Sequence, residues 1–384
     1  LPVPQRPVRL RSAVMDAPLR VALDVTPLAG EPTGIARAIN GVIHALCADP
    51  SLAISGWMLS GRRRVHPSGV PSGVPVHHCP VPARLLHPSW ARLPVPRGRL
   101  VHGPADVIHG MNYVVPPTNL PTVLTIQDAN LFENPEWYDP NVQRFASLIR
   151  RAIDRGCWVH VSTHAVADAL SRHCVVPDGR LAVIGYGVPE VPPGDAELGR
   201  QMAGTSQYIL ALGSVNRRKG LPELVEAFDR MPRRPPDLRL VIAGLPGLDE
   251  ERLERTVAGL ADPSAIVRIS SIDEAQRSNL LYGASVMAYP SFDEGFGFPP
   301  LEAMTAGVPV VASTGGSIPE VVGDAAILTP PGDVGALAGA MADALEDPLR
   351  TDLVERGRRR LSAHSWDATA AGLADLYRRA ADRG

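Results

Sequence analysis

SFDEGFGFPPLEAMTAGVPVVASTGGS, residues 291–317, follows an apolar run and places a glycine-rich loop and a helix-like segment before the next apolar run, VPVVAS. Pro299 and Pro300 suit the first turn of a helix, because the N–H that proline lacks has no partner there. Gly307 suits the end of that helix, where a left-handed backbone is common. The stretch therefore predicts a strand, a loop, a helix and a second strand, which is the repeating unit of an α/β fold.

Two carboxylates, Glu294 and Glu302, frame this junction and are separated by seven residues. We expect Glu294 in the loop and Glu302 in the first turn of the helix. Gly295 and Gly297 leave the loop backbone bare, so its N–H groups can approach a ligand. The amino end of the helix favours a negative charge such as phosphate. The spacing alone leaves a purely structural interpretation open, since any such junction can contain carboxylates and glycines.

The alternation of apolar runs and helical patterns extends over most of the chain. Strands are expected at 19–25, in an apolar run after the helix at 34–47, and at 106–110, 122–128 and 158–163 in the first half. In the second half they are expected at 208–214, 238–244, 265–270, 284–290 and 308–313. Helices are expected at 34–47 and 140–156. Two successive series predict two doubly wound, Rossmann-like α/β domains, with ligands bound in the cleft that the strand carboxyl ends face.

A Pro- and Gly-rich stretch between the two series predicts a linker. We expect a disordered tail or gene-start artefact at 1–18, a first domain at 19–190, a linker at 191–206, a second domain at 207–364 and a helix at 365–384. The last helix is expected to cross back to the first domain.

The composition argues against several classes of protein. The chain has 384 residues, with 38 Lys and Arg against 40 Asp and Glu, so it lacks the basic excess of a nucleic-acid binder. Its four cysteines form no CxxC pair, which favours a reducing compartment. No uncharged apolar run approaches the ~20 residues of a membrane-spanning helix, and the first twenty residues do not resemble a secretory signal. We therefore expect a globular cytoplasmic protein.

The segment GSVNRRKG, residues 213–220, ends one expected strand and contains Lys219, the only lysine of the chain. Every other basic position among Lys and Arg is arginine, so a lysine here suggests that a compact ammonium group is required at this position. A contact with a phosphate group would explain that requirement. Chance in an arginine-biased sequence is the alternative.

Other candidates lie near expected strand ends. Gly34 in PTGIARAI lets the backbone approach a ligand, and Arg37 lies one helical turn further on. Asp128, and His109 with Asn112, follow strands at the edge where a doubly wound sheet presents ligands. A structural cap or turn is an equal alternative for each.

Some motifs are absent from the sequence. Neither a complete G-x-G-x-x-G nor a Walker sequence occurs, and no Asp-x-Asp pair is present to hold a divalent metal on a sugar nucleotide. We therefore expect no metal or other cofactor. Ser317-Ile-Pro-Glu320 has the spacing of a capping box, which predicts a structural role for Glu320.

Together these features resemble the family-four retaining glycosyltransferases with a GT-B fold. The resemblance runs from about Leu23 to Trp366, and its most specific part is EGFGFPPLEAMTAGVPVVAS. TGIAR, TVLTIQD, HVSTHAVADAL, VIGYGV, ALGSVNRRKG and GSIPEVVGDAAIL are supporting matches. The resemblance implies a GT-B fold and transfer of a hexose from a nucleotide-sugar donor to a glycan, lipid-linked or small-molecule acceptor.

The resemblance also implies roles for individual residues on the donor side. Glu294 would contact the sugar hydroxyls near the anomeric carbon, while backbone amides around Gly295, Phe296 and Gly297 hold the sugar. Glu302 would bind the nucleotide ribose.

Cations would take the place of a metal in this interpretation. Arg218 and Lys219 would neutralise the diphosphate as the glycosidic bond breaks. Gly34 would let the loop of the first domain close over the phosphates, and Asp273 is a candidate for the base pocket.

The acceptor or sugar side would contain Asp128, Asn112 and Arg37. Gln127 stands where the family commonly has histidine, which puts one hydrogen bond to the sugar or acceptor in doubt. The adjacent Arg-Lys pair and TIQD look closest to bacterial mannosyltransferases of polysaccharide assembly. GDP-mannose is therefore the expected donor.

A basic stretch between Asp49 and Asp106 suggests an acceptor or surface of opposite charge. It contains no acidic residue, and it contains seven arginines and two tryptophans: Arg62, Arg63, Arg64, Arg84, Arg92, Arg97, Arg99, Trp57 and Trp90. One hypothesis is contact with an anionic acceptor or with the inner face of a membrane. The alternative is a solvated loop.

Two other functions stay open on the sequence. A sugar-nucleotide epimerase or hydrolase of the same fold would act on the donor without an acceptor. A degenerate sugar-nucleotide-binding subunit would support a partner enzyme without turnover.

Overall fold

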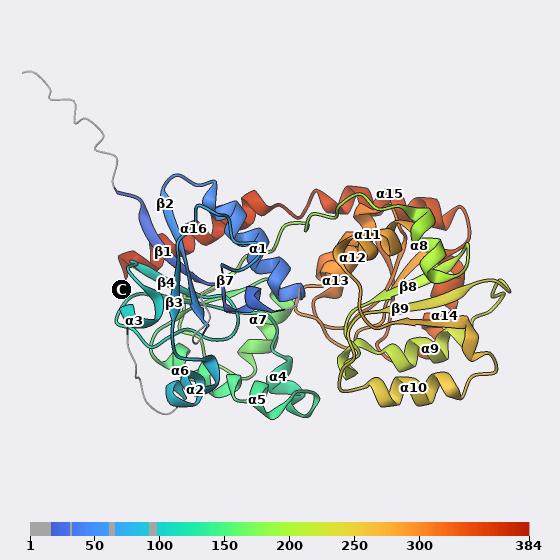
Figure 1. The fold of residues 1–384 in the computed structure, drawn as a ribbon, viewed down its shortest axis with the longest axis horizontal. Coiled ribbons are helices and arrows are strands. Elements are labelled where there is room, and N and C mark those ends of the chain that lie inside the picture. Colours follow the sequence, from blue (N-terminus) through green and yellow to red (C-terminus); the bar gives the residue numbers. More distant parts are fainter. Residues whose placement is uncertain (1–16, 31–32, 61–65, 92–97, 384) are drawn as a thin grey trace, which may run out of the picture.

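The protein consists of two α/β domains that lie side by side, each built around one parallel sheet with helices on both faces (Figure 1). The structure is a computed structural model that describes residues 17–30, 33–60, 66–91 and 98–383. It confirms the two doubly wound domains expected from the alternating pattern.

The first sheet has the strand order β3-β2-β1-β4-β5-β6-β7, and all neighbouring strands are parallel. Its strands are β1 (Leu19–Asp24), β2 (Leu52–Leu59), β3 (Val76–Cys79), β4 (Val107–Gly110), β5 (Thr122–Ile126), β6 (Trp158–Val161) and β7 (Leu181–Val183). The accompanying helices are η1 (Thr26–Ala29), α1 (Gly34–Cys47), α2 (Ala83–Trp90), α3 (Arg99–His102), α4 (Asn130–Glu133), η2 (Pro135–Trp137), α5 (Pro140–Gln143), α6 (Phe145–Asp154) and α7 (His164–Ser171).

The second sheet has the order β10-β9-β8-β11-β12-β13 and is also entirely parallel. Its strands are β8 (Tyr208–Leu212), β9 (Arg239–Ala243), β10 (Ile266–Ile269), β11 (Val286–Tyr289), β12 (Val310–Ser313) and β13 (Ala326–Thr329). The helices that follow β7 are α8 (Ala196–Ala203), η3 (Arg217–Lys219), α9 (Leu221–Asp229), α10 (Glu250–Ala258), η4 (Pro263–Ala265), α11 (Glu274–Gly283), α12 (Phe298–Thr305), α13 (Ile318–Val322), α14 (Val334–Ala344), α15 (Leu349–Leu361) and α16 (Trp366–Asp382).

Helix α1 shows how the sequence pattern produces the packing. Ile39, Val42, Ile43 and Leu46 recur at helical spacing and are completely buried. Burying each such side chain stabilises the fold by roughly 1.5–3 kcal/mol. The Thr33 hydroxyl caps the helix by accepting a hydrogen bond from the N–H of Ala36.

Each sheet reverses its strand order at one point, and this point places the loops that can bind ligands. The reversal lies between β1 and β4 in the first sheet and between β8 and β11 in the second. The loops after β8 and β11 therefore adjoin each other at the carboxyl edge of the second sheet.

Helix α16 belongs to the packing of the first domain, although it follows the second domain in the chain (Figure 1). It lies against α1, β4 and β5, and its Leu373, Leu376 and Tyr377 are completely buried. Trp366, at the start of α16, packs directly against Gly41 and Gly187. A Cβ at either glycine would lie within 2.4 Å of the Trp366 ring, so neither position has room for a side chain.

The interval expected to be a linker, 191–206, contains helix α8. Asp195 caps this helix by accepting from the N–H groups of Glu197 and Leu198, and Gly204 ends it in a left-handed conformation. Gly199 packs closely against the backbone of Asn279 in α11. The segment is thus part of the helical layer of the second domain, and its glycines serve close packing rather than flexibility.

Three further features differ from the expectations. Strands β3, β7 and β13 were not anticipated, and the helix expected at 140–156 is divided into α5 and α6. Trp57 and Trp90 are buried in the core of the first domain, so neither is available to a surface ligand. Arg84 and Arg99 of the basic stretch are exposed. The other five arginines, Arg62, Arg63, Arg64, Arg92 and Arg97, lie outside the described residues.

Candidate functional site

The loop between β11 and α12 carries the first carboxylate of the predicted site. Gly297 precedes α12 with a φ of 98°, a backbone conformation that favours glycine, and it turns the chain from the strand into the helix. Pro299 and Pro300 lie in the first turn of α12, as expected. Glu302 is the fifth residue of this helix, so it lies just beyond the first turn.

Three charged side chains form an ion-pair triad where the β8 and β11 loops adjoin: Arg218, Lys219 and Glu294. The Lys219 Nζ lies 2.6 Å from Glu294 Oε1, and the Arg218 Nη1 lies 2.5 Å from Glu294 Oε2. The Lys219 ammonium also donates to the Tyr289 hydroxyl at 2.9 Å and lies 4.7 Å from the centre of that ring. The structure thus joins two segments that are 75 residues apart in the sequence.

Charge pairing controls the protonation of the ion-pair triad. Burial alone would raise the pKa of the Glu294 carboxyl, but the cations of Arg218 and Lys219 lower it to about 2. Burial lowers the pKa of the Lys219 ammonium to about 8, although Glu294 opposes this shift. Glu294 is therefore a carboxylate at neutral pH, and the triad carries one surplus positive charge.

Two aspartates approach the ion-pair triad from the two domains. Asp128 follows β5 in the first domain, and Asp293 directly precedes Glu294 in the second. Burial raises the pKa of Asp293 to about 7, and the nearby charges of Asp128 and Glu294 add to this rise. Burial also raises the pKa of Asp128, while Arg218 and a hydrogen bond from Tyr113 oppose the shift.

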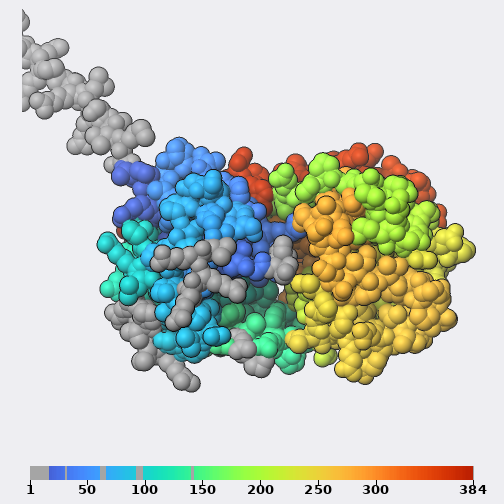
Figure 2. Space-filling view, viewed as in Figure 1, coloured from blue at the N-terminus to red at the C-terminus, as the bar shows by residue number. Residues whose placement is uncertain are grey.

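A cleft of about 410 Å³ opens beside these carboxylates, between the two domains. It is lined by Asp128, Ala129, Glu133, Asn134, Trp137, Ala165, Val166, Asp168, Ala169, Arg172, Phe292, Asp293, Glu294, Gly316 and Ser317. Figure 2 shows the two halves of the molecule meeting along a groove, with the blue and cyan segments on one side and the yellow and orange segments on the other.

Glu302 lies completely buried beside this site and is held by two arginines. Its carboxylate pairs with Arg277 of α11, and the Arg37 Nη1 lies 3.5 Å from its Oε1. Arg37 belongs to α1 of the first domain and also pairs with Glu274 at 2.5 Å. Arg37 therefore links the two domains next to the predicted ribose carboxylate.

The backbone of Gly295 makes a second contact between the domains. Its carbonyl oxygen accepts a hydrogen bond from the Ser162 hydroxyl at 3.0 Å. A Cβ at this position would lie 1.8 Å from the carbonyl oxygen of Gln127, so a side chain would force the domains apart. Phe296 is buried against Tyr186 of the first domain.

Glu320 forms a third contact, which differs from the expected capping box. Its carboxylate accepts hydrogen bonds of 3.0 and 3.1 Å from the N–H groups of His164 and Ala165 at the start of α7. Ser317, the expected partner, makes no side-chain cap and instead bonds the Thr163 hydroxyl at 2.6 Å. Glu320 thus caps a helix of the opposite domain.

The remaining predicted residues do not all gather at the cleft. Gly34 begins α1 and a Cβ there would meet open space, so a ligand could approach its backbone. Asn112 follows β4, and its buried Oδ1 has no hydrogen-bond partner in the part of the chain that the structure describes. Asp273 caps α11 in a capping box with Gln276. His109 is buried in the core and bonds Tyr377 and Thr125 at 2.7 Å.

Sequence reasoning missed Asp293 and Tyr289 although both adjoin the quoted stretch. Asp293 was visible as the acidic neighbour of Glu294, and Tyr289 as the polar end of an apolar strand. Arg277 and Glu274 were not anticipated because their role depends on how α1 and α11 approach each other.

Comparisons with known proteins agree with this geometry. Residues 200–360 match the family model described as "Glycosyl transferases group 1". The O-antigen chain mannosyltransferase B of Escherichia coli is 27% identical over 311 residues, which cover 77% of this chain and 78% of that protein. The chain is a glycosyltransferase with a group 1 domain. It transfers a sugar from a nucleotide-sugar donor.

This glycosyltransferase has relatives and structural neighbours over nearly its whole length. The D-inositol 3-phosphate glycosyltransferase of Paenarthrobacter aurescens is 26% identical over 94% of this chain and 97% of that protein. The structure of sucrose-phosphate synthase from Thermosynechococcus elongatus superposes with a TM-score of 0.71 at 20% identity, covering 94% of this chain and 98% of that one. The latter likeness establishes the GT-B fold. No helix of the described part of the chain is both long and apolar enough to span a membrane.

Proposed function

We propose that this glycosyltransferase transfers a mannosyl unit from GDP-mannose to a hydroxyl group of an uncharged glycan, with retention of anomeric configuration and without a metal ion. The observation that carries the proposal is the ion-pair triad at the point where the strand order of the second sheet reverses. The relative named as a mannosyltransferase supports the choice of sugar.

The surplus positive charge of the triad suits a diphosphate leaving group. When the bond between the sugar C1 and the phosphate oxygen breaks, negative charge grows on the departing diphosphate. Arg218 and Lys219 would stabilise that charge, and their burial strengthens the interaction because water is excluded. This supports a mechanism in which protein cations neutralise the leaving group.

The two glutamates suit the other parts of the donor. Glu294 stays ionised, so it accepts hydrogen bonds from sugar hydroxyls and does not donate a proton. The buried Glu302 Oε1 is 3.5 Å from Arg37 Nη1 but makes no hydrogen bond with the described residues, so it could accept one from a ribose hydroxyl.

The charge of the cleft supports an acceptor without phosphate. Among the described residues that line the cleft, five carry carboxylates, and the single arginine, Arg172, already pairs with Glu133. In their ionised forms, Asp128 and Asp293 accept hydrogen bonds from hydroxyl groups but repel an anion at close range. A hydroxyl-rich neutral acceptor therefore fits the cleft better than a phosphorylated one, including the anionic acceptor suggested by the basic stretch.

A thermal-shift panel tests the donor first, without added metal. It compares GDP-mannose, UDP-glucose, UDP-N-acetylglucosamine, UDP-galactose, GDP and UDP. A ligand at 100 times its dissociation constant stabilises the native state by ~2.7 kcal/mol, and we expect this for GDP-mannose and a smaller shift for GDP. Stabilisation by a uridine nucleotide alone would contradict the proposed donor.

A transfer assay then tests the reaction. Methyl α-mannoside should accept the sugar, mannose 6-phosphate should be a much poorer acceptor, and the product anomer, read by NMR, should retain its configuration. Activity should survive EDTA. Release of free mannose at the same rate with and without acceptor would instead favour the hydrolase alternative, and an inverted product would contradict retention.

A further inference from the structure

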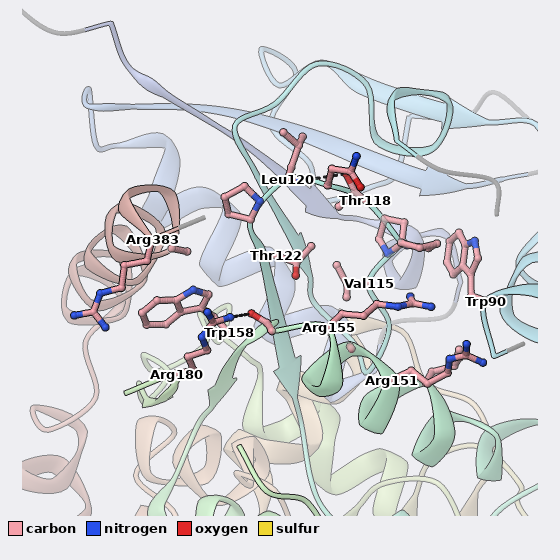
Figure 3. Close-up of a pocket in the computed structure, with 18 residues that line it drawn as sticks. Trp90, Val115, Thr118, Leu120, Thr122, Arg151, Arg155, Trp158, Arg180 and Arg383 are labelled. Carbon is pink, nitrogen blue, oxygen red and sulfur yellow. Dashed lines mark hydrogen bonds between the residues drawn. The ribbon is translucent and has the colours of Figure 1, made fainter. Parts of the chain in front are cut away.

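A second hollow lies at the opposite edge of the first sheet from the cleft (Figure 3). It has a volume of about 400 Å³ and contacts Thr122 and Trp158, which begin β5 and β6, and Arg180, which precedes β7. Ligands of doubly wound sheets bind at the carboxyl edge, so this hollow is separate from the donor and acceptor site.

The hollow is strongly basic. Arg151, Arg155, Arg180 and Arg383 line it, and its described lining residues include no Asp or Glu. Figure 3 shows Arg151 on α6 and Arg155 just after its end at one side, and Arg180 and Arg383 beside Trp158 at the other. The charge is thus arranged around the hollow rather than along one helix.

Two of these arginines are held by uncharged groups. Arg151 donates to the carbonyl oxygen of Ala91, and Arg180 donates to that of Gly156. The Arg180 guanidinium also lies 5.8 Å from the centre of the Trp158 ring. These contacts fix the guanidinium positions of Arg151 and Arg180. Neither has a carboxylate partner among the described residues, unlike Arg37, Arg218 and Arg277 at the cleft.

Fixed guanidinium groups around a concave surface concentrate positive potential there. The planar fork of arginine matches two oxygens of a phosphate, and a site held in place loses little side-chain entropy on binding. The proline and valine side chains of 115–117 and the Trp158 ring add an apolar wall.

We propose that this hollow is a second ligand site that binds a phosphate-bearing anion. The phosphate group would contact guanidinium groups that line the hollow, and any apolar part of the ligand would contact Trp158. The ligand is a soluble phosphate compound or the head group of an anionic lipid, and both share this chemistry.

Titration calorimetry with inorganic pyrophosphate tests the site. The donor site also has cations for this probe, so we expect two classes of site in the wild-type protein. Lys219→Ala should weaken one class, and Arg155→Glu should weaken the other by at least about tenfold, equivalent to about 1.4 kcal/mol. Arg155 is exposed, so its substitution should leave the thermal transition unchanged. Arg180→Ala is the second variant if that transition falls.

Arg359→Glu is the matched control, because Arg359 is an exposed arginine on α15 of the second domain and the change in net charge is the same.

Flotation with vesicles of phosphatidylcholine and phosphatidylglycerol distinguishes a lipid head group from a soluble phosphate compound. Binding to vesicles that Arg155→Glu abolishes assigns the site to a lipid head group, and pyrophosphate binding without flotation assigns it to a soluble phosphate. A single class of site, lost in Lys219→Ala, overturns the proposal, as does an equal loss in Arg359→Glu.

Discussion

The two faces of the interdomain cleft are built in different ways. On the second domain, Arg218 and Lys219 both pair with Glu294 within two adjoining loops, so this face is assembled before any ligand arrives. On the first domain, Arg37 and the N–H groups of His164 and Ala165 pair with carboxylates of the second domain. The arrangement of charged side chains on the donor face is therefore set by pairing within the second domain. On the opposite face it is set by how closely the two domains approach.

Replacing Glu294 should have the largest effect on the stability and activity of the donor face. Glu294→Ala leaves the buried Lys219 and the partly buried Arg218 without their shared carboxylate, which should lower the free energy of unfolding by about 3–5 kcal/mol and abolish measurable transfer. Denaturant unfolding and initial rates measure both effects. Glu294→Gln keeps the volume and should restore part of the stability but little activity. Equal losses in Glu294→Ala and Asp128→Asn would contradict the contrast between the faces.

Removing the ammonium of Lys219 should have the next largest effect. Lys219→Ala should lower kcat/KM for the donor by a factor that corresponds to about 2–5 kcal/mol, because a desolvated cation on the diphosphate is lost. The KM for the acceptor should change little. Arg217→Ala is the control, since Arg217 lies in the same turn but is exposed. An unchanged Lys219→Ala enzyme would show that the lysine has no role at the diphosphate.

Glu320 allows the dependence on domain approach to be tested directly. Glu320→Ala should cost about 0.5–2 kcal/mol of stability as a lost helix cap, and it should also increase the radius of gyration measured by small-angle scattering. Asp333→Ala removes a cap within the second domain, on α14, and should lower stability alone. Similar scattering curves for both variants would mean that Glu320 does not hold the domains together.

The last prediction concerns pH. The pKa of Asp293 is raised from 3.8 to about 7, so between these values the folded state binds more protons than the unfolded state. Stability should therefore fall as pH rises through this window, and Asp293→Asn should make the dependence shallower. Thermal unfolding of both proteins from pH 4 to 8 measures the difference. Parallel curves would show that Asp293 titrates normally.

The sequence predicted the donor face better than the acceptor face, for a physical reason. The loop glycines, the prolines of α12 and the Arg218-Lys219 pair are local signals of turns, helix starts and charge. The strand order of the second sheet then brings the loops after β8 and β11 together, because β8 and β11 are neighbours in that sheet. Arg37 was noticed as a candidate, but its pairing with Glu274 depends on the placement of two domains, which no local pattern contains.

Glu320 and Asp273 show the limit of spacing rules. Both have the spacing of a capping box, and Asp273 forms one with Gln276. Glu320 instead reaches a helix 156 residues earlier in the chain, because the start of α7 lies opposite α13 and offers unpaired N–H groups. Helix α8 was hidden for a related reason, since the glycines that allow its close packing resemble those of a linker.

The return of α16 to the first domain has a consequence for synthesis on the ribosome. The second domain is continuous in the chain, so all its strands have emerged before α16 is made. The core of the first domain is complete only when Leu373, Leu376 and Tyr377 of α16 pack against α1, β4 and β5. Domains that are complete at the N-terminus usually fold first during translation. Here the later-made domain can complete its core first, and the nascent first domain keeps an apolar face exposed until the last helix arrives.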